Sequence, residues 1–127
     1  MQPDITDAKK QMELLLNLKK QLAEYLFSGL VLKVHKKLQP YRVPQPTLKV
    51  REMKTRWGSW NVPKYIMTLN TKLIVFPKKV IEYIIMHEFC HYFEANHGPR
   101  FYAWLTKFMP DWKERKQLLN SLNIKLG

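Results

Sequence analysis

The spacing of hydrophobic residues predicts two helical segments in the first third of the chain. The first is expected from about Asp4 to Phe27, where Ser28-Gly29 should end it. Its helical spacing is carried by Met12, Leu15, Leu16, Leu22 and Leu26. A second helix is expected over about Leu30–Leu38, because Pro40 disfavours helical backbone just before it. His35 in this segment is expected to be an ordinary surface histidine.

The middle of the chain alternates between apolar and polar residues in the manner of short strands. Thr47–Lys54 shows this alternation, and Tyr65–Leu69 predicts a second strand. Trp57-Gly58-Ser59 between them is expected to form a turn.

Proline residues mark the predicted starts of three helices in the last part of the chain. Pro77, Pro99 and Pro110 suit the first helical position, where no backbone N–H is needed. The residues expected to face inward are Val80, Ile81, Ile84 and Ile85 after Pro77, and Phe101, Leu105 and Phe108 after Pro99. A short sheet flanked by helices gives an α+β fold.

Length and composition indicate one globular domain over residues 1–127. We divide it into an N-terminal helical segment, 1–39, and a core, 47–122. No apolar run approaches the roughly 20 residues that cross a bilayer, so no membrane association is expected. The one cysteine, Cys90, excludes an internal disulfide and suits a reducing, cytoplasmic compartment.

Three of the four histidines fall in one short window that begins with His87-Glu88-Phe89-Cys90-His91. Residues four apart lie on one face of a helix, so His87 and His91 can address one metal ion with Glu88 beside it. His97 can add a third nitrogen if the helix ends soon after His91. Asn96 tolerates a left-handed helix end, and Gly98-Pro99 suits a chain reversal before a new helix. Histidine pairs at this spacing also occur as ordinary hydrogen-bonded residues, but the agreement of these signals favours a metal site.

Zinc hydrolases with this motif differ in their third ligand, and the residues leave three arrangements to compare. The first has a glycine midway to the third histidine, where this chain has Glu94. The second uses a downstream glutamate, for which Glu114 is the candidate. The third has a histidine at the helix end followed by a small residue and Phe, as in His97-Gly98-Pro99-Arg100-Phe101.

Several separated motifs resemble the YgjP-like metallopeptidase family, whose core is similar to those of SprT-like and WLM zinc proteases. The motifs are Thr55–Ser59, Val80–Ile85, His87–His91, Asn96-His97 and Met109–Arg115. The resemblance implies a zincin-like core with the motif on a central helix, and one zinc ion bound by His87, His91 and His97. It also implies a protein or peptide substrate, Glu88 as the catalytic base, and a structural role for Glu114. Trp60 stands where the family usually has Cys.

The net charge of +12 is concentrated before the motif. Lys33–Lys79 carries twelve basic residues and one acid, which suits a solvated basic face or attraction to a polyanion, either nucleic acid or an acidic protein surface. Lys54, Arg56 and Trp57 are therefore candidate contacts for substrate or nucleic acid. The alternative to a peptidase is a nucleic-acid-binding or accessory domain with a structural or vestigial zinc. Glu88 argues against that alternative, because zinc binding alone needs no carboxylate there.

Overall fold

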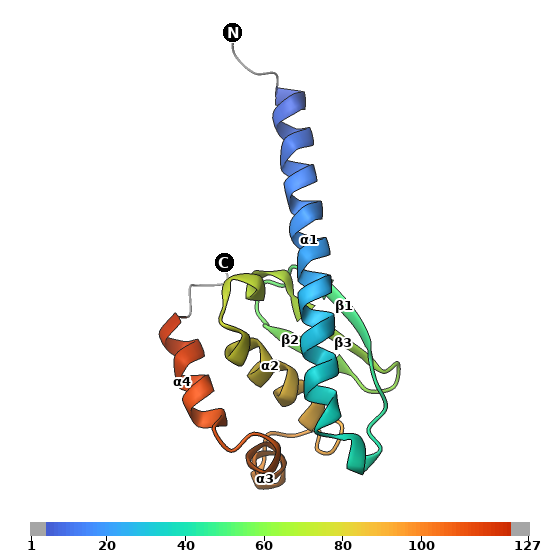
Figure 1. Ribbon diagram of the computed structural model, residues 1–127, viewed down its shortest axis with the longest axis vertical. Helices are drawn as coiled ribbons and strands as arrows, with labels where there is room; N and C mark the ends of the chain where they lie inside the picture. Colours follow the sequence, from blue (N-terminus) through green and yellow to red (C-terminus); the bar gives the residue numbers. More distant parts are fainter. Residues whose placement is uncertain (1–4, 123–127) are drawn as a thin grey trace.

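The computed structural model describes residues 5–122, which form four α-helices and a three-stranded sheet (Figure 1). The helices are α1 (Ile5–Lys36), α2 (Lys78–Cys90), α3 (Pro99–Phe108) and α4 (Trp112–Leu122). The strands are β1 (Thr47–Arg51), β2 (Gly58–Asn61) and β3 (Ile66–Asn70). Short 3-10 turns η1 (Gln39–Tyr41) and η2 (Thr71–Val75) follow α1 and β3. Among these residues, no helix combines the length and apolar character needed to cross a membrane.

The last strand in the chain is the central strand of the sheet, whose order is β1-β3-β2. β1 pairs in parallel with β3, so that Thr47 lies opposite Ile66. β2 pairs antiparallel with β3, so that Gly58 lies opposite Leu69. Both β1 and β2 are therefore edge strands, and β2 is the one that runs beside α2.

α2 is the central element of the fold, since it packs against α1, α3, α4 and β2. The expected apolar stripe is confirmed, but burial extends around the whole helix, because neighbours cover α2 on several sides. Ten of its thirteen residues are buried. Pro99 is the first residue of α3, as predicted, whereas Pro77 is the N-cap of α2 and α4 begins at Trp112, two residues after Pro110.

The prediction of two helices in the first third of the chain is wrong, because α1 runs unbroken through Ser28-Gly29. Buried residues of α1 lie on both sides of this pair, from Ala23 to Val34, and packing outweighs the cost of about 1 kcal/mol for a helical glycine. The Ser28 hydroxyl donates a hydrogen bond of 2.6 Å to the Glu24 carbonyl oxygen, one turn earlier in the same helix, so its side chain finds a partner without interrupting α1.

The sheet also departs from the sequence expectation in its boundaries. β1 ends at Arg51 rather than Lys54. Gly58 and Ser59, expected in a turn, begin β2 because they pair with Leu69 and Thr68 of β3. Tyr65 precedes β3 in a left-handed conformation with φ of 59° and closes the turn between β2 and β3. A bulky aromatic residue gives no sequence signal for that conformation.

Candidate metal centre and catalytic site

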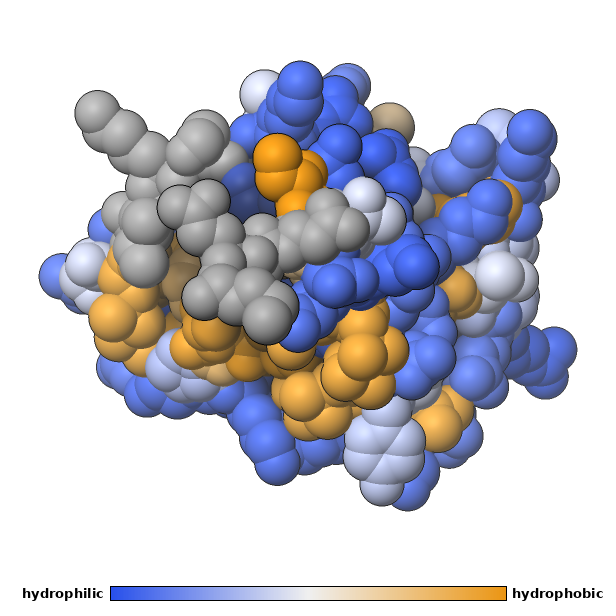
Figure 2. Space-filling model, turned by 90° about the horizontal axis from the view of Figure 1, so that it is seen from above, coloured by the Kyte–Doolittle hydropathy of each residue, from blue (hydrophilic) through white to orange (hydrophobic). Residues whose placement is uncertain are grey.

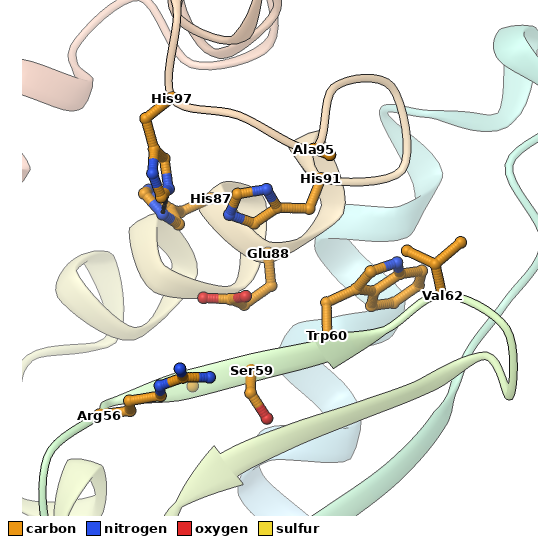
Figure 3. Close-up of a pocket in the computed structure, with 10 residues that line it drawn as sticks. Arg56, Ser59, Trp60, Val62, His87, Glu88, His91, Ala95 and His97 are labelled. Carbon is orange, nitrogen blue, oxygen red and sulfur yellow. Dashed lines mark hydrogen bonds between the residues drawn. The ribbon is translucent and has the colours of Figure 1, made fainter.

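α2 carries the first two histidines to one end of the helix, where both rings face the same hollow (Figure 3). The helix ends at Cys90, and His91 caps it while keeping helical angles. The spacing of one turn between His87 and His91 is therefore preserved beyond the last regular residue.

His97 reaches the same place through a tight chain reversal after α2. The backbone N–H groups of Phe93 and Glu94 both donate to the Cys90 carbonyl, which tightens the first turn of the connection. Among the described residues only Arg42 and Tyr65 have positive φ, so the left-handed conformation that Asn96 would tolerate is not adopted. The reversal is made by successive turns, and α3 then begins at Pro99.

The three histidines form a compact cluster of nitrogen donors. One ligand atom from each of His87, His91 and His97 lies within 4.8 Å of the others. The Nε2 atoms of His87 and His97 are 3.1 Å apart. Tetrahedral zinc with bonds of about 2.0–2.1 Å holds neighbouring nitrogens about 3.3 Å apart, so this donor set fits such an ion after small adjustments.

Phe101 of α3 lies beside all three imidazole rings. Its ring centroid is 4.9 Å from that of His87, 4.8 Å from that of His91 and 4.8 Å from that of His97. Phe101 is fully buried. It therefore couples the docking of α3 to the orientation of the three candidate ligands.

The environment favours the neutral form of His87 and His91 and leaves His91 with a free nitrogen toward the cluster. His91 Nδ1 lies 3.2 Å from the Glu94 carbonyl oxygen, so this nitrogen carries the donated proton and Nε2 is left free for a metal. Burial, with the neighbouring charges of His91, His97 and Lys116, lowers the pKa of His87 to about 4. Burial likewise lowers the pKa of His91. Neutral imidazoles are the form that binds metals.

Glu88 is buried between α2 and β2, next to the histidine cluster (Figure 3). Burial raises the pKa of Glu88 to about 7, although the charge of Arg56 opposes this shift. A carboxyl group whose pKa lies near neutrality can both accept and return a proton. β2 approaches so closely because Gly58 has no side chain: a β-carbon there would lie 3.3 Å from Glu88 Cγ.

Asn70 fixes the segment that carries Arg56 by hydrogen bonds. This role of Asn70 was not predicted from the sequence. Its fully buried side-chain amide donates to the carbonyls of Met53, at 2.9 Å, and Arg56, at 2.8 Å. Its Oδ1 accepts from the Lys72 backbone N–H at 3.0 Å. The sequence offers one weak signal, an Asn directly after an apolar strand, which marks a turn without naming its partners.

The candidate contacts for substrate or nucleic acid differ in how far their side chains are exposed. Arg56 and Lys54 are exposed, and Arg56 lines the hollow beside Glu88. Trp57 is half-buried and packs on Phe76 with ring centroids 5.0 Å apart. Trp60, on β2, lines the hollow near His91.

Two further sequence interpretations can be compared with the structure. Glu114 is exposed in the first turn of α4, and the metal-binding cluster among residues 5–122 does not include it. The expectation that His35 is an ordinary surface residue is wrong. Its Nε2 lies 2.6 Å from the Val43 carbonyl oxygen and its half-buried ring faces Phe89, because α1 packs on α2 at this point.

Comparison with known families decides the class of protein. The pattern described as YgjP-like, metallopeptidase domain matches residues 2–122. The chain belongs to the YgjP-like metallopeptidase family. It is accordingly a metallopeptidase, and membership implies a metal ion. A comparison with curated proteins finds no match.

Two solved structures share the α+β fold of this YgjP-like chain. One is the metallopeptidase zymogen of Methanocaldococcus jannaschii jannalysin, with a TM-score of 0.63 and 20% identity over 76% of this chain and 90% of the other. The second is the metallopeptidase zymogen of Pyrococcus abyssi abylysin, with a TM-score of 0.65 and 18% identity over 76% and 94%. At these identities the similarity establishes the fold alone.

Proposed function

We propose that this YgjP-like protein is a zinc metallopeptidase in which one zinc ion binds His87, His91 and His97 and Glu88 is the catalytic base. The observation that carries the proposal is the juxtaposition of three imidazole nitrogens within 4.8 Å and a buried carboxyl group in one hollow. Zinc, when bound, supplies a Lewis acid that makes water acidic near neutral pH and polarises a carbonyl group.

Glu88 moves the proton in this mechanism. Its carboxylate accepts a proton from the attacking water and returns it to the nitrogen of the leaving amine. The pKa of about 7 suits both transfers at neutral pH. Arg56 is placed to bind a carbonyl oxygen or carboxylate of the substrate, because its guanidinium borders the same hollow.

The shape around Glu88 supports an extended peptide substrate. A hollow of about 470 Å³ is lined by the three histidines, Glu88 and Trp60. A second hollow of about 240 Å³ is lined on its far side by Tyr83 and Leu119. Glu88 and Arg56 line both hollows, so a peptide can extend in two directions from the catalytic carboxylate. The free edge of β2 offers backbone groups to such a peptide as an added strand.

Trp60 is the residue we assign to substrate selection. It replaces the usual family Cys, and its indole packs edge-on against Tyr65 at 5.4 Å. Its Nε1 has no hydrogen-bond partner among the described residues. We expect Trp60→Cys to widen the hollow and change the preferred peptide side chain, while zinc binding stays the same.

The deciding experiment compares wild-type protein with Glu88→Gln and His97→Ala. Elemental analysis should find about one zinc per chain in the wild type and in Glu88→Gln, and less in His97→Ala. Cleavage of an unstructured protein such as casein should be lost in Glu88→Gln. A wild type that binds no zinc, or full activity in Glu88→Gln, would overturn the proposal.

We also propose that the exposed basic residues bring the peptidase to protein substrates bound to nucleic acid. Lys54 and Arg56 are exposed and Arg56 lines the hollow, whereas the packing of Trp57 on Phe76 leaves less of its ring for base stacking. Affinity for single-stranded DNA should fall in Lys54→Ala/Arg56→Ala, with a smaller slope against log salt. If the slope of DNA affinity against log salt is unchanged in the double variant, Lys54 and Arg56 do not bind nucleic acid. A cytoplasmic location and a single domain over residues 1–127, with a core at 47–122, complete the proposal.

Unchanged behaviour of Glu88→Gln in every assay would favour the alternative of an accessory domain with structural or vestigial zinc. The buried position of Glu88 argues for catalysis, because a carboxyl group in such a place costs folding energy without contributing a ligand.

A further inference from the structure

The first half of α1 stands clear of the rest of the molecule (Figure 1). Every buried residue of α1 lies between Ala23 and Val34. Before Ala23, large apolar side chains are more than half exposed on the projecting helix. They are Ile5, Met12, Leu14, Leu15, Leu16, Leu18 and Leu22. Apolar side chains on an unsupported helix need an explanation, because burial is what normally stabilises helices in proteins.

A regular repeat runs along the outer side of α1. Its members alternate at intervals of three and four residues, as the a and d positions of a coiled coil do. We call this set the outer seam, and it consists of Ala8, Gln11, Leu15, Leu18, Leu22, Tyr25, Gly29 and Leu32, all of them exposed. At 100° per residue, the centre of the outer seam lies roughly 140° around the helix from the buried face. The outer seam is thus separate from the face that packs on the core.

The outer seam is hollowed at the point where α1 meets the rest of the protein. A groove of about 670 Å³ is lined by seam residues Tyr25, Gly29 and Leu32, together with Leu26 and Leu30. A β-carbon at Gly29 would have nothing within 4 Å, so the seam has a gap there. A knob from a second helix can enter this gap, as in knobs-into-holes packing.

The exposed apolar surface of the outer seam is large enough for a small interface. Its large exposed side chains are Leu15, Leu18, Leu22, Tyr25 and Leu32. At roughly 100 Å² each they give about 500 Å² per copy, or about 1,000 Å² for two copies, the size at which specific interfaces begin. Figure 2 looks down the long axis and shows most of the visible orange hydrophobic side chains in the lower half of the view, with others near the top and at the right.

Charge favours a second copy of the chain as the partner. Ile5–Leu32 carries three acidic and four basic residues, whereas Lys33–Lys79 carries one acidic and twelve basic residues. Charge repulsion between two copies is therefore much weaker along Ile5–Leu32 than it would be along Lys33–Lys79. The residues that flank the seam carry no run of one charge sign that would select an oppositely charged partner. Identical seams are self-complementary under a two-fold axis.

We propose that two copies of this protein associate through their outer seams as a two-helix coiled coil. No residue of the outer seam lines the hollows around Glu88. Association is therefore a property independent of the proposed peptidase activity, and each can fail without the other.

The test is sedimentation equilibrium over a concentration series of the full chain, with helicity monitored by circular dichroism. The wild type should dimerise, and Leu18→Glu should raise the dissociation constant at least tenfold. Leu16→Glu is the matched control, because Leu16 is 56% exposed against 52% for Leu18 but lies off the seam. It should change the dissociation constant little.

A variant that strengthens the dimer completes the test, because misfolding could weaken association but would not strengthen it. Gln11 is the one polar side chain in the seam, so Gln11→Leu should lower the dissociation constant several-fold. A wild type that stays monomeric at about 100 μM, equal effects of Leu16→Glu and Leu18→Glu, or no gain in Gln11→Leu would overturn the proposal. So would a monomer that binds lipid vesicles through α1, since the seam would then face a membrane surface.

Discussion

Gly58 and Glu88 lie so close together that a methyl group on Gly58 would stand 3.3 Å from the Cγ atom of the glutamate. The same methyl group would lie 3.3 Å from the backbone carbonyl oxygen of Thr68. A β-carbon at position 58 would also lie 3.3 Å from Leu69 Cδ2, so the side chains of Glu88 and Leu69 both have to give by a few tenths of an ångström.

Gly58→Ala should accordingly reduce catalysis while sparing zinc. A base displaced by a few tenths of an ångström should lower kcat/KM by roughly 2- to 5-fold, since a shift of 1 Å in a reacting group costs about 100-fold. Peptide cleavage and zinc content measured on one preparation check the prediction. Gly29→Ala is the control, because nothing surrounds a β-carbon at that position. Loss of zinc together with activity in Gly58→Ala would mean that the residue supports the fold rather than the base.

Phe101→Leu should weaken metal binding without unfolding the protein. The aromatic ring contacts all three imidazoles, and the smaller side chain gives them freedom to turn. We expect zinc affinity to fall by about 10- to 100-fold, as is usual when groups that orient metal ligands are changed. Competition with a fluorescent chelator measures the affinity. Phe108→Leu on the same helix removes a buried ring that has no contact with a histidine and should leave the affinity unchanged.

Asn70→Asp should destabilise the protein by about 2–4 kcal/mol. The aspartate cannot donate to the carbonyls of Met53 and Arg56, and each buried acceptor left unpaired costs about 1–3 kcal/mol. Urea denaturation gives the free energy of unfolding. Asn61→Asp makes a useful comparison, because the exposed Asn61 side chain only accepts a hydrogen bond from the Lys64 backbone. If both variants lose equal stability, the Asn70 hydrogen bonds do not hold the Arg56 segment.

Stability should fall in acid because of Glu82. Burial by itself would raise the pKa of Glu82, but hydrogen bonds from Lys33 and Arg115, at 2.8 and 3.1 Å, outweigh it and leave this pKa below its ordinary value. A carboxyl group with a depressed folded pKa stabilises the protein above its unfolded pKa of about 4.3 and loses that contribution as the pH falls through the folded value.

The variant Glu82→Gln should therefore be less stable than the wild type at pH 7, by about 1–2 kcal/mol after solvent screening at the exposed Lys33 is allowed for. The difference should shrink as the pH approaches 3. Unfolding free energies at several pH values measure it, and Glu13→Gln on the exposed part of α1 is the control. A constant difference across the range would contradict the assignment.

The candidate ligands were predictable because their signals are local. The interval between His87 and His91 is a property of any helix, and Pro99 with Phe101 marked the element that follows His97. The roles of Gly58 and Asn70 were not predictable, because both depend on contacts between residues far apart in the sequence. Gly58 lies against Glu88, 30 positions later, and Asn70 bonds Arg56, 14 positions earlier. The course of α1 through Gly29 was missed for the same reason, since burial against distant elements outweighs the local stop signal.

The strand order has a consequence for the protein during its synthesis. β3 separates β1 from β2 in the sheet but follows both in the chain, so neither strand has a backbone partner until Asn70 has left the ribosome. The buried face of α1 packs on β1, η2 and α2, so it is fully covered only after α2 is completed at Cys90. The nascent chain therefore emerges with unpaired strand edges and an uncovered apolar helix, which is the condition in which chaperones bind and newly made chains aggregate.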